Sequence, residues 1–184
     1  MKRALIVVDL QNDYFEGGRM ELAGTEAAAR KAAELMAAFR ARGWPVILVQ
    51  HVMTRHPAPF FEAGTQGAEI HALVRPAPGE RVIVKAFPNS FRETGLAAAL
   101  AEEGVRDLVI TGAMSHMCVD STTRAAADLG YGCTVAHDAC AARGLAFGGV
   151  EVPAATVHAS YMAGLASGFA AVLSTAEVIA ALPD

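Results

Sequence analysis

The chain has 184 residues and a formal net charge of -4 at pH 7, and 53% of its residues are hydrophobic against 18% charged. This composition excludes a wholly disordered chain, and the length suits a single domain over residues 1–184. The mild acidity and the lack of a Lys/Arg cluster exclude the usual electrostatic signature of nucleic-acid and anionic-membrane binding. No apolar run approaches the ~18 residues that a transmembrane helix needs. We therefore expect neither nucleic acid nor membrane among the partners.

The first residues and the cysteines predict a cytoplasmic protein. Asp9 interrupts the apolar run near the N-terminus, and no small-residue cleavage site follows, so the run predicts a strand rather than an export signal. Cys118, Cys133 and Cys140 form an odd set without CxxC spacing. Such a set fits free thiols in a reducing compartment better than a disulfide framework.

Short apolar segments alternate with longer segments of helical periodicity. The predicted strands are mostly continuous apolar runs, as expected where helices cover both faces of a parallel sheet. They span residues 4–9, 46–50, 81–85, 107–112, 133–137 and 170–174. Alanine-rich helices are predicted over residues 25–42, 94–103, 118–129 and 152–166, with a last helix after Ser174. This repetition predicts an α/β fold, a Rossmann-like, doubly wound three-layer α/β/α sandwich around a mostly parallel six-stranded sheet.

Residues at the carboxyl ends of the predicted strands are the candidate site, because ligands of such folds bind there. Asp9 ends the first strand, Lys85 ends the third, and Cys118 follows the fourth after a short loop. Taken singly, these residues could be a turn cap, a solvated strand end and a small buried side chain. Together they are the base, the electrostatic partner and the nucleophile that covalent hydrolysis of an amide needs. Because Cys118 would open a helix beside a lysine, we expect its pKa to be lowered.

Three segments carry a resemblance to a known family. They are LIVVDLQNDY (5–14), VIVKAFPNSFRETGL (82–96) and GAMSHMCVDSTTRAAADLGY (112–131). In this order they resemble the isochorismatase-like cysteine hydrolase superfamily, which includes nicotinamidases and N-carbamoylsarcosine amidases. The resemblance implies a Rossmann-like fold and an Asp–Lys–Cys triad that falls on Asp9, Lys85 and Cys118.

The family mechanism implies a role for each member of the triad. Asp9 would be the general acid and base, and Cys118 would attack a carbonyl carbon and form a thioester. Lys85 would favour the thiolate and hold Asp9 in place. The family also implies a cis peptide bond between Ala113 and Met114, with the backbone N–H groups of Met114 and Cys118 as the oxyanion hole.

Four further residues are candidate substrate contacts. Gln11, Tyr14 and Phe91 match family positions near the substrate pocket, and His116 flanks the nucleophile. Tyr14 and Phe91 could pack against a small planar or apolar group. Two alternatives stay open, since Phe91 could equally fill the core and His116 could be a capping or hydrogen-bonding residue.

The sequence predicts no metal and no other cofactor. His51, His56 and His71 lie in a long loop, and because their spacing fits no helix or strand face we expect them to be exposed rather than to bind zinc. Nicotinamidases hold a metal with three ligands after the second strand, and the matching positions here are His51, Met53 and Phe60. All three positions are altered, which argues against that metal and against nicotinamide as the substrate.

The sequence thus predicts a cysteine hydrolase that cleaves a C–N bond of a small amide or carbamoyl compound. One alternative is an isochorismatase proper, which cleaves a vinyl ether by acid catalysis from Asp9 and needs no nucleophile. Another is a catalytically silent, oligomeric binding protein of the same fold. The alanine-rich helices offer closely packing faces, so we expect a homo-oligomer that binds a small-molecule substrate. No glycine fingerprint for a dinucleotide follows the first strand.

Overall fold

The computed structural model describes residues 2–183 and is built on a parallel six-stranded sheet. Its strands lie in the order β3-β2-β1-β4-β5-β8. They are β1 (Lys2–Val8), β2 (Val46–His51), β3 (Arg81–Lys85), β4 (Val105–Ala113), β5 (Gly132–Ala141) and β8 (Ala171–Leu173). The six predicted strands and the α/β fold are confirmed. The largest difference is at β5, which continues beyond residue 137 to Ala141 because its end still pairs with β4.

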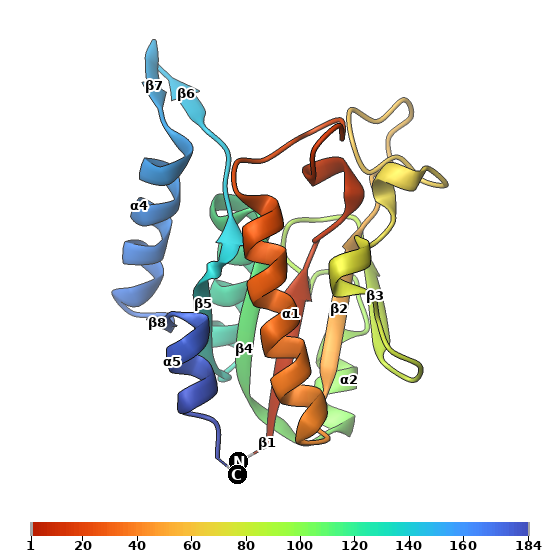
Figure 1. Ribbon diagram of the computed structural model, residues 1–184, viewed down its shortest axis with the longest axis vertical. Coiled ribbons are helices and arrows are strands. Elements are labelled where there is room, and N and C mark those ends of the chain that lie inside the picture. The colour runs from red at the N-terminus through yellow and green to blue at the C-terminus, as the bar shows by residue number, and fades with distance from the viewer. Residues whose placement is uncertain (1, 184) are drawn as a thin grey trace.

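Helices cover both faces of the sheet, which makes the three-layer sandwich that the sequence predicts (Figure 1). One face carries α1 (Thr25–Ala41) and α5 (Thr175–Ala180), and the other carries α2 (Leu96–Glu102), α3 (Asp120–Asp128) and α4 (Ala154–Ala166). The strands are apolar on both sides because successive side chains alternate between the two cores. In β1, Leu5 packs into the core beneath α1, whereas Ile6 packs into the opposite core. Within residues 2–183, no helix is both long and apolar enough to cross a membrane.

The strand order creates a crevice between β1 and β4. The chain adds β2 and β3 on one side of β1 and then returns to place β4 on the other side. In open α/β sheets, the loops that leave two such strands diverge, and ligands bind where they part. Asp9 directly follows β1, and Cys118 lies in the turn that follows β4, so both flank this crevice.

A short hairpin is the part of the fold that the sequence analysis missed. β6 (Leu145–Phe147) and β7 (Val150–Val152) pair antiparallel, and the helix predicted from residue 152 begins at Ala154 instead. The hairpin stands clear of the sheet in Figure 1, and Phe147 is 89% exposed. Strands of three residues are too short to show the alternation by which a strand is recognised.

Gly112 allows β4 to pass close to β1 near the crevice. Its φ is 125°, and a Cβ atom there would lie 2.0 Å from the carbonyl oxygen of Val8. A side chain would therefore strain the backbone and clash with an atom of the central strand. We expect Gly112→Ala to lower the free energy of unfolding by on the order of 3 kcal/mol in urea denaturation. Gly168→Ala is the control, because its Cβ would meet nothing within 4 Å, and equal stability of the two variants would contradict the prediction.

Candidate active site

The carboxyl ends of three strands and the turn after β4 bring four side chains to one buried point. The Nζ atom of Lys85 lies 2.7 Å from Oδ2 of Asp9 and 3.2 Å from Sγ of Cys118. It also lies 3.0 Å from Nδ1 of His51. All four residues are buried. The structure thus brings together the three residues of the predicted triad and adds His51 to them.

The prediction that His51 is exposed is wrong. His51 was expected to be exposed in a loop together with His56 and His71, and His56 is indeed exposed. His51 is instead the last residue of β2, where it pairs with Lys85 of β3 and is buried. A second strand predicted one residue longer would have placed His51 at a strand end, where the rule that selected Asp9 and Lys85 applies.

Asp9 and Lys85 form a fully buried ion pair. Burial by itself would raise the pKa of Asp9, but this pKa is lowered, chiefly by the charge of Lys85. Burial would likewise lower the pKa of Lys85, but this pKa is raised, chiefly by the charge of Asp9. Both groups are therefore charged at neutral pH, and each compensates the lost hydration of the other.

Cys118 is a neutral thiol in this environment. It lies in a π-helical turn, Ser115–Val119, that leads into α3. Burial raises its pKa, and the charge of Asp9 raises it further against the opposing effect of Lys85. The prediction of a lowered pKa is wrong, because the loss of hydration and the charge of Asp9 outweigh the effect of the lysine. A neutral thiol beside an ionised carboxylate can pass its proton to that carboxylate when it attacks a substrate.

The backbone before Cys118 turns sharply. The peptide bond between Ala113 and Met114, which the resemblance implies to be cis, is cis in the structure. The carbonyl oxygen of Met114 then accepts hydrogen bonds from the N–H groups of Met117 and Val119, at 3.0 and 3.2 Å. These bonds wind the chain into the π-helical turn that carries Cys118 to Lys85.

Gln11 holds the end of β2 in place. Its Nε2 donates to the carbonyl oxygens of His51 and Ala68, at 2.8 and 2.7 Å, and its Oε1 accepts from the N–H of His51 at 2.7 Å. Both protons of the side-chain amide are thus committed to the backbone. Gln11 positions His51 in this structure, where the resemblance suggested a substrate contact.

Tyr14 packs beside the four-residue cluster. Its ring centroid lies 4.5 Å from that of Phe61, and its side chain is buried. Burial raises the pKa of Tyr14 well above its ordinary value, and the charge of Asp9 raises it further. The phenol is therefore neutral and can only contribute a hydroxyl group and an aromatic face to the site.

Phe91 and His116 have different surroundings. Phe91 stacks on Tyr131, with ring centroids 6.0 Å apart, and packs against the core on the α2–α4 face. His116 is buried edge-on against Tyr161 at 5.9 Å, and within residues 2–183 its Nδ1 has no hydrogen-bond partner. Burial lowers the pKa of His116, and the charge of Arg143 lowers it further, so the ring is neutral.

The cluster contains side chains of the kinds that bind metals, but the ammonium group of Lys85 lies among them. Single donor atoms of Asp9, His51 and Cys118 lie within 4.8 Å of one another. The ammonium nitrogen of Lys85 lies 2.7 to 3.2 Å from these side chains. A divalent ion bound there would have to displace a buried cation that already has an anionic partner. The residues present therefore do not fit a resident metal.

Several cavities lie near the carboxyl edge of the sheet, and two of them bear on the site. One, of about 490 Å³, follows the ends of β2 and β3 and is lined by Met53, Lys85 and Phe87 among others. Lys85 is the one clustered residue in its lining, although the side chain of Lys85 has no exposed surface, and the cavity lies where the fold predicts a ligand.

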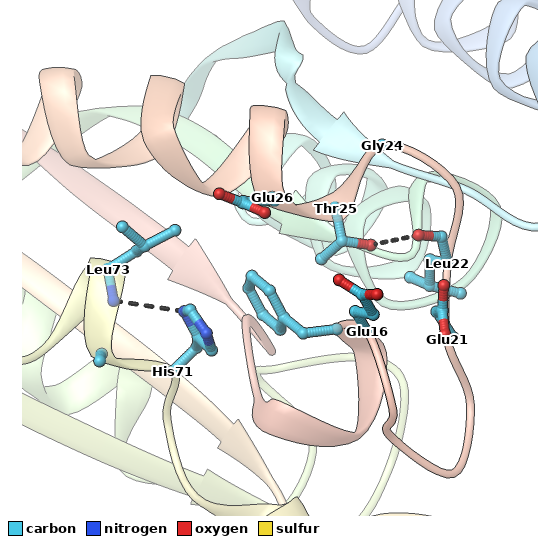
Figure 2. A pocket seen from close by; sticks show the side chains of 10 residues that line it. Glu16, Glu21, Leu22, Gly24, Thr25, Glu26, His71 and Leu73 are labelled. Carbon is cyan, nitrogen blue, oxygen red and sulfur yellow. Dashed lines mark hydrogen bonds between the residues drawn. The ribbon is translucent and has the colours of Figure 1, made fainter.

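The other cavity, of about 570 Å³, is acidic and is shown in Figure 2. Glu16, Glu21 and Glu26 line it, and all three are exposed. The ring of His71 also lines it, half-buried rather than exposed as predicted, and its Nδ1 accepts from the N–H of Leu73. This cavity is a solvated acidic surface, and it contains none of the four clustered side chains.

Comparison with known proteins places this chain in a family. Residues 3–177 match the isochorismatase domain. The isochorismatase family protein YddQ of Bacillus subtilis is 49% identical over 175 residues, which cover 95% of this chain and 97% of that protein. A crystal structure from Oleispira antarctica, described as an isochorismatase hydrolase, has 50% sequence identity and a TM-score of 0.94, and the match covers 97% of this chain and 96% of that one.

Some of the more distant relatives are enzymes whose names state an activity. A ureidoacrylate amidohydrolase of Variovorax paradoxus is 30% identical over 169 residues, with 74% of this chain and 67% of that protein covered. The N-carbamoylsarcosine amidase of Thermoplasma acidophilum has 25% sequence identity and a TM-score of 0.81, with 95% and 97% of the two chains covered. The domain match, the relatives and the fold agree. The chain belongs to the isochorismatase family, and it is a hydrolase.

Proposed function

We propose that this hydrolase cleaves a C–N bond of a small amide or carbamoyl compound through a thioester on Cys118. The observation that carries the proposal is the contact of Lys85 Nζ with both Asp9 Oδ2, at 2.7 Å, and Cys118 Sγ, at 3.2 Å. A base, a nucleophile and a cation within hydrogen-bonding distance are the groups that covalent hydrolysis of an amide needs. The likeness to an amidohydrolase and an amidase supports this class of substrate.

The first half of the reaction forms the thioester. Asp9 is ionised, and it accepts the proton of the Cys118 thiol as Sγ attacks the carbonyl carbon of the substrate. The backbone N–H groups of Met114 and Cys118 stabilise the negative charge that develops on the carbonyl oxygen. The C–N bond then breaks, and Asp9 passes its proton to the leaving nitrogen.

The second half hydrolyses the thioester. A water molecule attacks the thioester carbon and gives a proton to Asp9, and the acid product leaves as the C–S bond breaks. Asp9 returns the proton to the sulfur of Cys118, which restores the thiol. Lys85 contacts both groups, so the negative charge stays beside the same cation as it moves between oxygen and sulfur. In a buried site that attraction is stronger than it would be in water.

An amide panel with product and enzyme readouts tests the proposal. Primary amides, carbamoyl and ureido compounds are incubated with the full chain, and ammonia or amine release is measured. Acid-quenched samples are digested and analysed by mass spectrometry, and we expect the acyl group on Cys118. Isochorismate, a vinyl ether, is tested in parallel. Its cleavage without any adduct on Cys118 would contradict the proposal and favour acid catalysis by Asp9, and binding without turnover of either class would favour a silent binding protein.

We further propose that the enzyme acts as a homo-oligomer in the cytoplasm. The three cysteines are free thiols in the structure, which supports a reducing compartment. The exposed side of α4 carries small side chains one helical turn apart, at Ala155, Ala159 and Ala163, and this supports close packing against another subunit. Light scattering during size-exclusion chromatography measures the molar mass, and 19.1 kDa, the mass of one chain, would contradict the oligomer.

A further inference from the structure

The proposed reaction involves Asp9, Lys85 and Cys118, and it assigns no role to His51, the fourth residue of the cluster. His51 Nδ1 lies 3.0 Å from Lys85 Nζ. An ammonium group can only donate, so Nδ1 must accept and the ring proton must be on Nε2. Lys85 therefore determines the tautomer of His51 as well as contacting the nucleophile and the base.

Within residues 2–183, two buried polar atoms near Lys85 have no hydrogen-bond partner. The three ammonium protons match three acceptors, which are Asp9 Oδ2, Cys118 Sγ and His51 Nδ1. The Nε2–H of His51 remains a buried donor without a hydrogen-bond partner within residues 2–183. Oδ1 of Asp9 is likewise a buried acceptor without a partner in this part of the chain. Buried polar groups in folded proteins are almost always paired, so two unpaired ones beside a nucleophile call for a ligand that supplies the partners.

The imidazole of His51 is also held rigidly. Gln11 binds the N–H and the carbonyl oxygen of His51 at 2.7 and 2.8 Å. The ring is buried, and the ring centroid of Phe61 lies 6.0 Å away. Turning the ring over would remove Nδ1 from Lys85, so the direction of the Nε2–H bond is set before any ligand binds. A donor that is oriented in advance loses little entropy on binding.

We propose that His51 is a further substrate contact that determines specificity. Its Nε2–H donates to an oxygen of the substrate, while Oδ1 of Asp9 accepts from a substrate N–H. Such a pair selects a group that presents an oxygen acceptor beside an N–H donor, as primary amide, carbamoyl and ureido groups do. Analogues that lack either atom leave a buried protein group unpaired and are rejected. This inference rests on the proposed function and names the part of the substrate that the site recognises.

Two alkylating agents test the inference without knowledge of the substrate. Iodoacetamide carries a primary amide, whereas iodoacetonitrile is similar in size and has the same leaving group but no amide. The second-order rate constants for Cys118 are measured with both, the modified residue is located by mass spectrometry, and the ratio is divided by that for glutathione. We expect wild-type protein to favour iodoacetamide at least about fivefold over this reference, as one or two added hydrogen bonds would. A ratio equal to that of glutathione would overturn the inference.

The His51→Asn variant distinguishes the role of Nδ1 from the role of Nε2. The amide oxygen of asparagine can replace Nδ1 as the acceptor from Lys85, but nothing then stands where Nε2–H was. We expect the ratio to fall by about threefold or more, towards that of glutathione, with the iodoacetonitrile rate changed less than about twofold because Lys85 and Cys118 keep their contact. His71→Asn is the matched control and is expected to leave both rates unchanged, since His71 lines the separate acidic cavity.

The outcomes distinguish this inference from the proposed function. If amides are hydrolysed through Cys118 but the His51→Asn ratio equals that of wild type, only the role of His51 is overturned. If both rates fall together in His51→Asn, the histidine acts through Lys85 and not on the ligand, which also overturns it. If Cys118 carries no acyl group with any amide, the proposed function itself fails. The wild-type ratio stands as a test even if the variant does not fold.

Discussion

Replacing Cys118 with alanine is expected to lower kcat/KM for the amide or carbamoyl substrate by about 10⁴-fold or more. Without sulfur, no covalent bond to the carbonyl carbon can form, and Asp9 has no thiol proton to accept. Lys85 and Asp9 keep their 2.7 Å ion pair in this variant, so the fold around the site is retained. The rate of ammonia or amine release at high enzyme concentration measures the loss.

Cys133→Ala is the matched control for this experiment. Cys133 is also a buried free thiol, but it lies at the start of β5, at the opposite end of the sheet from the cluster. In residues 2–183, the hydrogen-bond partners of its Sγ are the backbone carbonyl oxygens of Tyr131, at 3.5 Å, and Thr123, at 3.9 Å. We expect kcat/KM within about threefold of wild type, because a buried thiol without an activating partner is inert. Activity of Cys118→Ala above about 1% of wild type would contradict covalent catalysis and favour acid catalysis by Asp9.

Replacing Lys85 with methionine is expected to lower the free energy of unfolding by about 3–5 kcal/mol. Lys85 and Asp9 have no exposed side-chain surface, so the substitution leaves a carboxylate buried without its cation. Burial, which acts to raise the pKa of Asp9, would then no longer be opposed by Lys85. Urea denaturation at pH 7, with the circular dichroism of the helices as the signal, measures the change.

Two further variants isolate the ion pair. Lys31→Met removes a lysine of similar reach whose partner, Glu34, is exposed, and we expect a loss of at most about 1 kcal/mol. The double substitution Asp9→Asn and Lys85→Met removes both buried charges, and we expect it to be more stable than Lys85→Met alone. A double variant whose loss equals the sum of the two single losses would show that the pair contributes no interaction energy.

The neutral thiol of Cys118 is consistent with a reaction in which proton transfer accompanies attack. In a resting enzyme with a free thiolate, Asp9 and the sulfur would hold two negative charges next to one lysine in a dry site. With the proton on sulfur, the cluster holds one carboxylate and one ammonium, and its net charge is zero. Because the proton moves to Asp9 as the sulfur attacks, two negative charges are never held together beside Lys85.

Most of the fold and the positions of the triad follow from local patterns in the amino-acid sequence. Continuous apolar runs with intervening helical periodicity defined the six strands to within a few residues, because residues buried on both faces of a sheet must be apolar whatever their neighbours are. Asp9 and Lys85 were located because polar residues at the ends of such runs fall at the ligand-binding edge. These signals are local, so they can be recognised in a single amino-acid sequence.

The protonation states and the contacts of these residues depend on the packing of the whole fold. The pKa of Cys118 is raised and not lowered, because hydration is lost to everything that packs around the sulfur, and no spacing in the sequence records that packing. His51 joins the cluster because β2 extends one residue further than predicted and pairs with Lys85 there. Gln11, predicted as a substrate contact, instead binds the backbone at that end of β2. Contacts between residues more than thirty positions apart depend on how the strands are ordered and registered, and this is settled only when the whole sheet has formed.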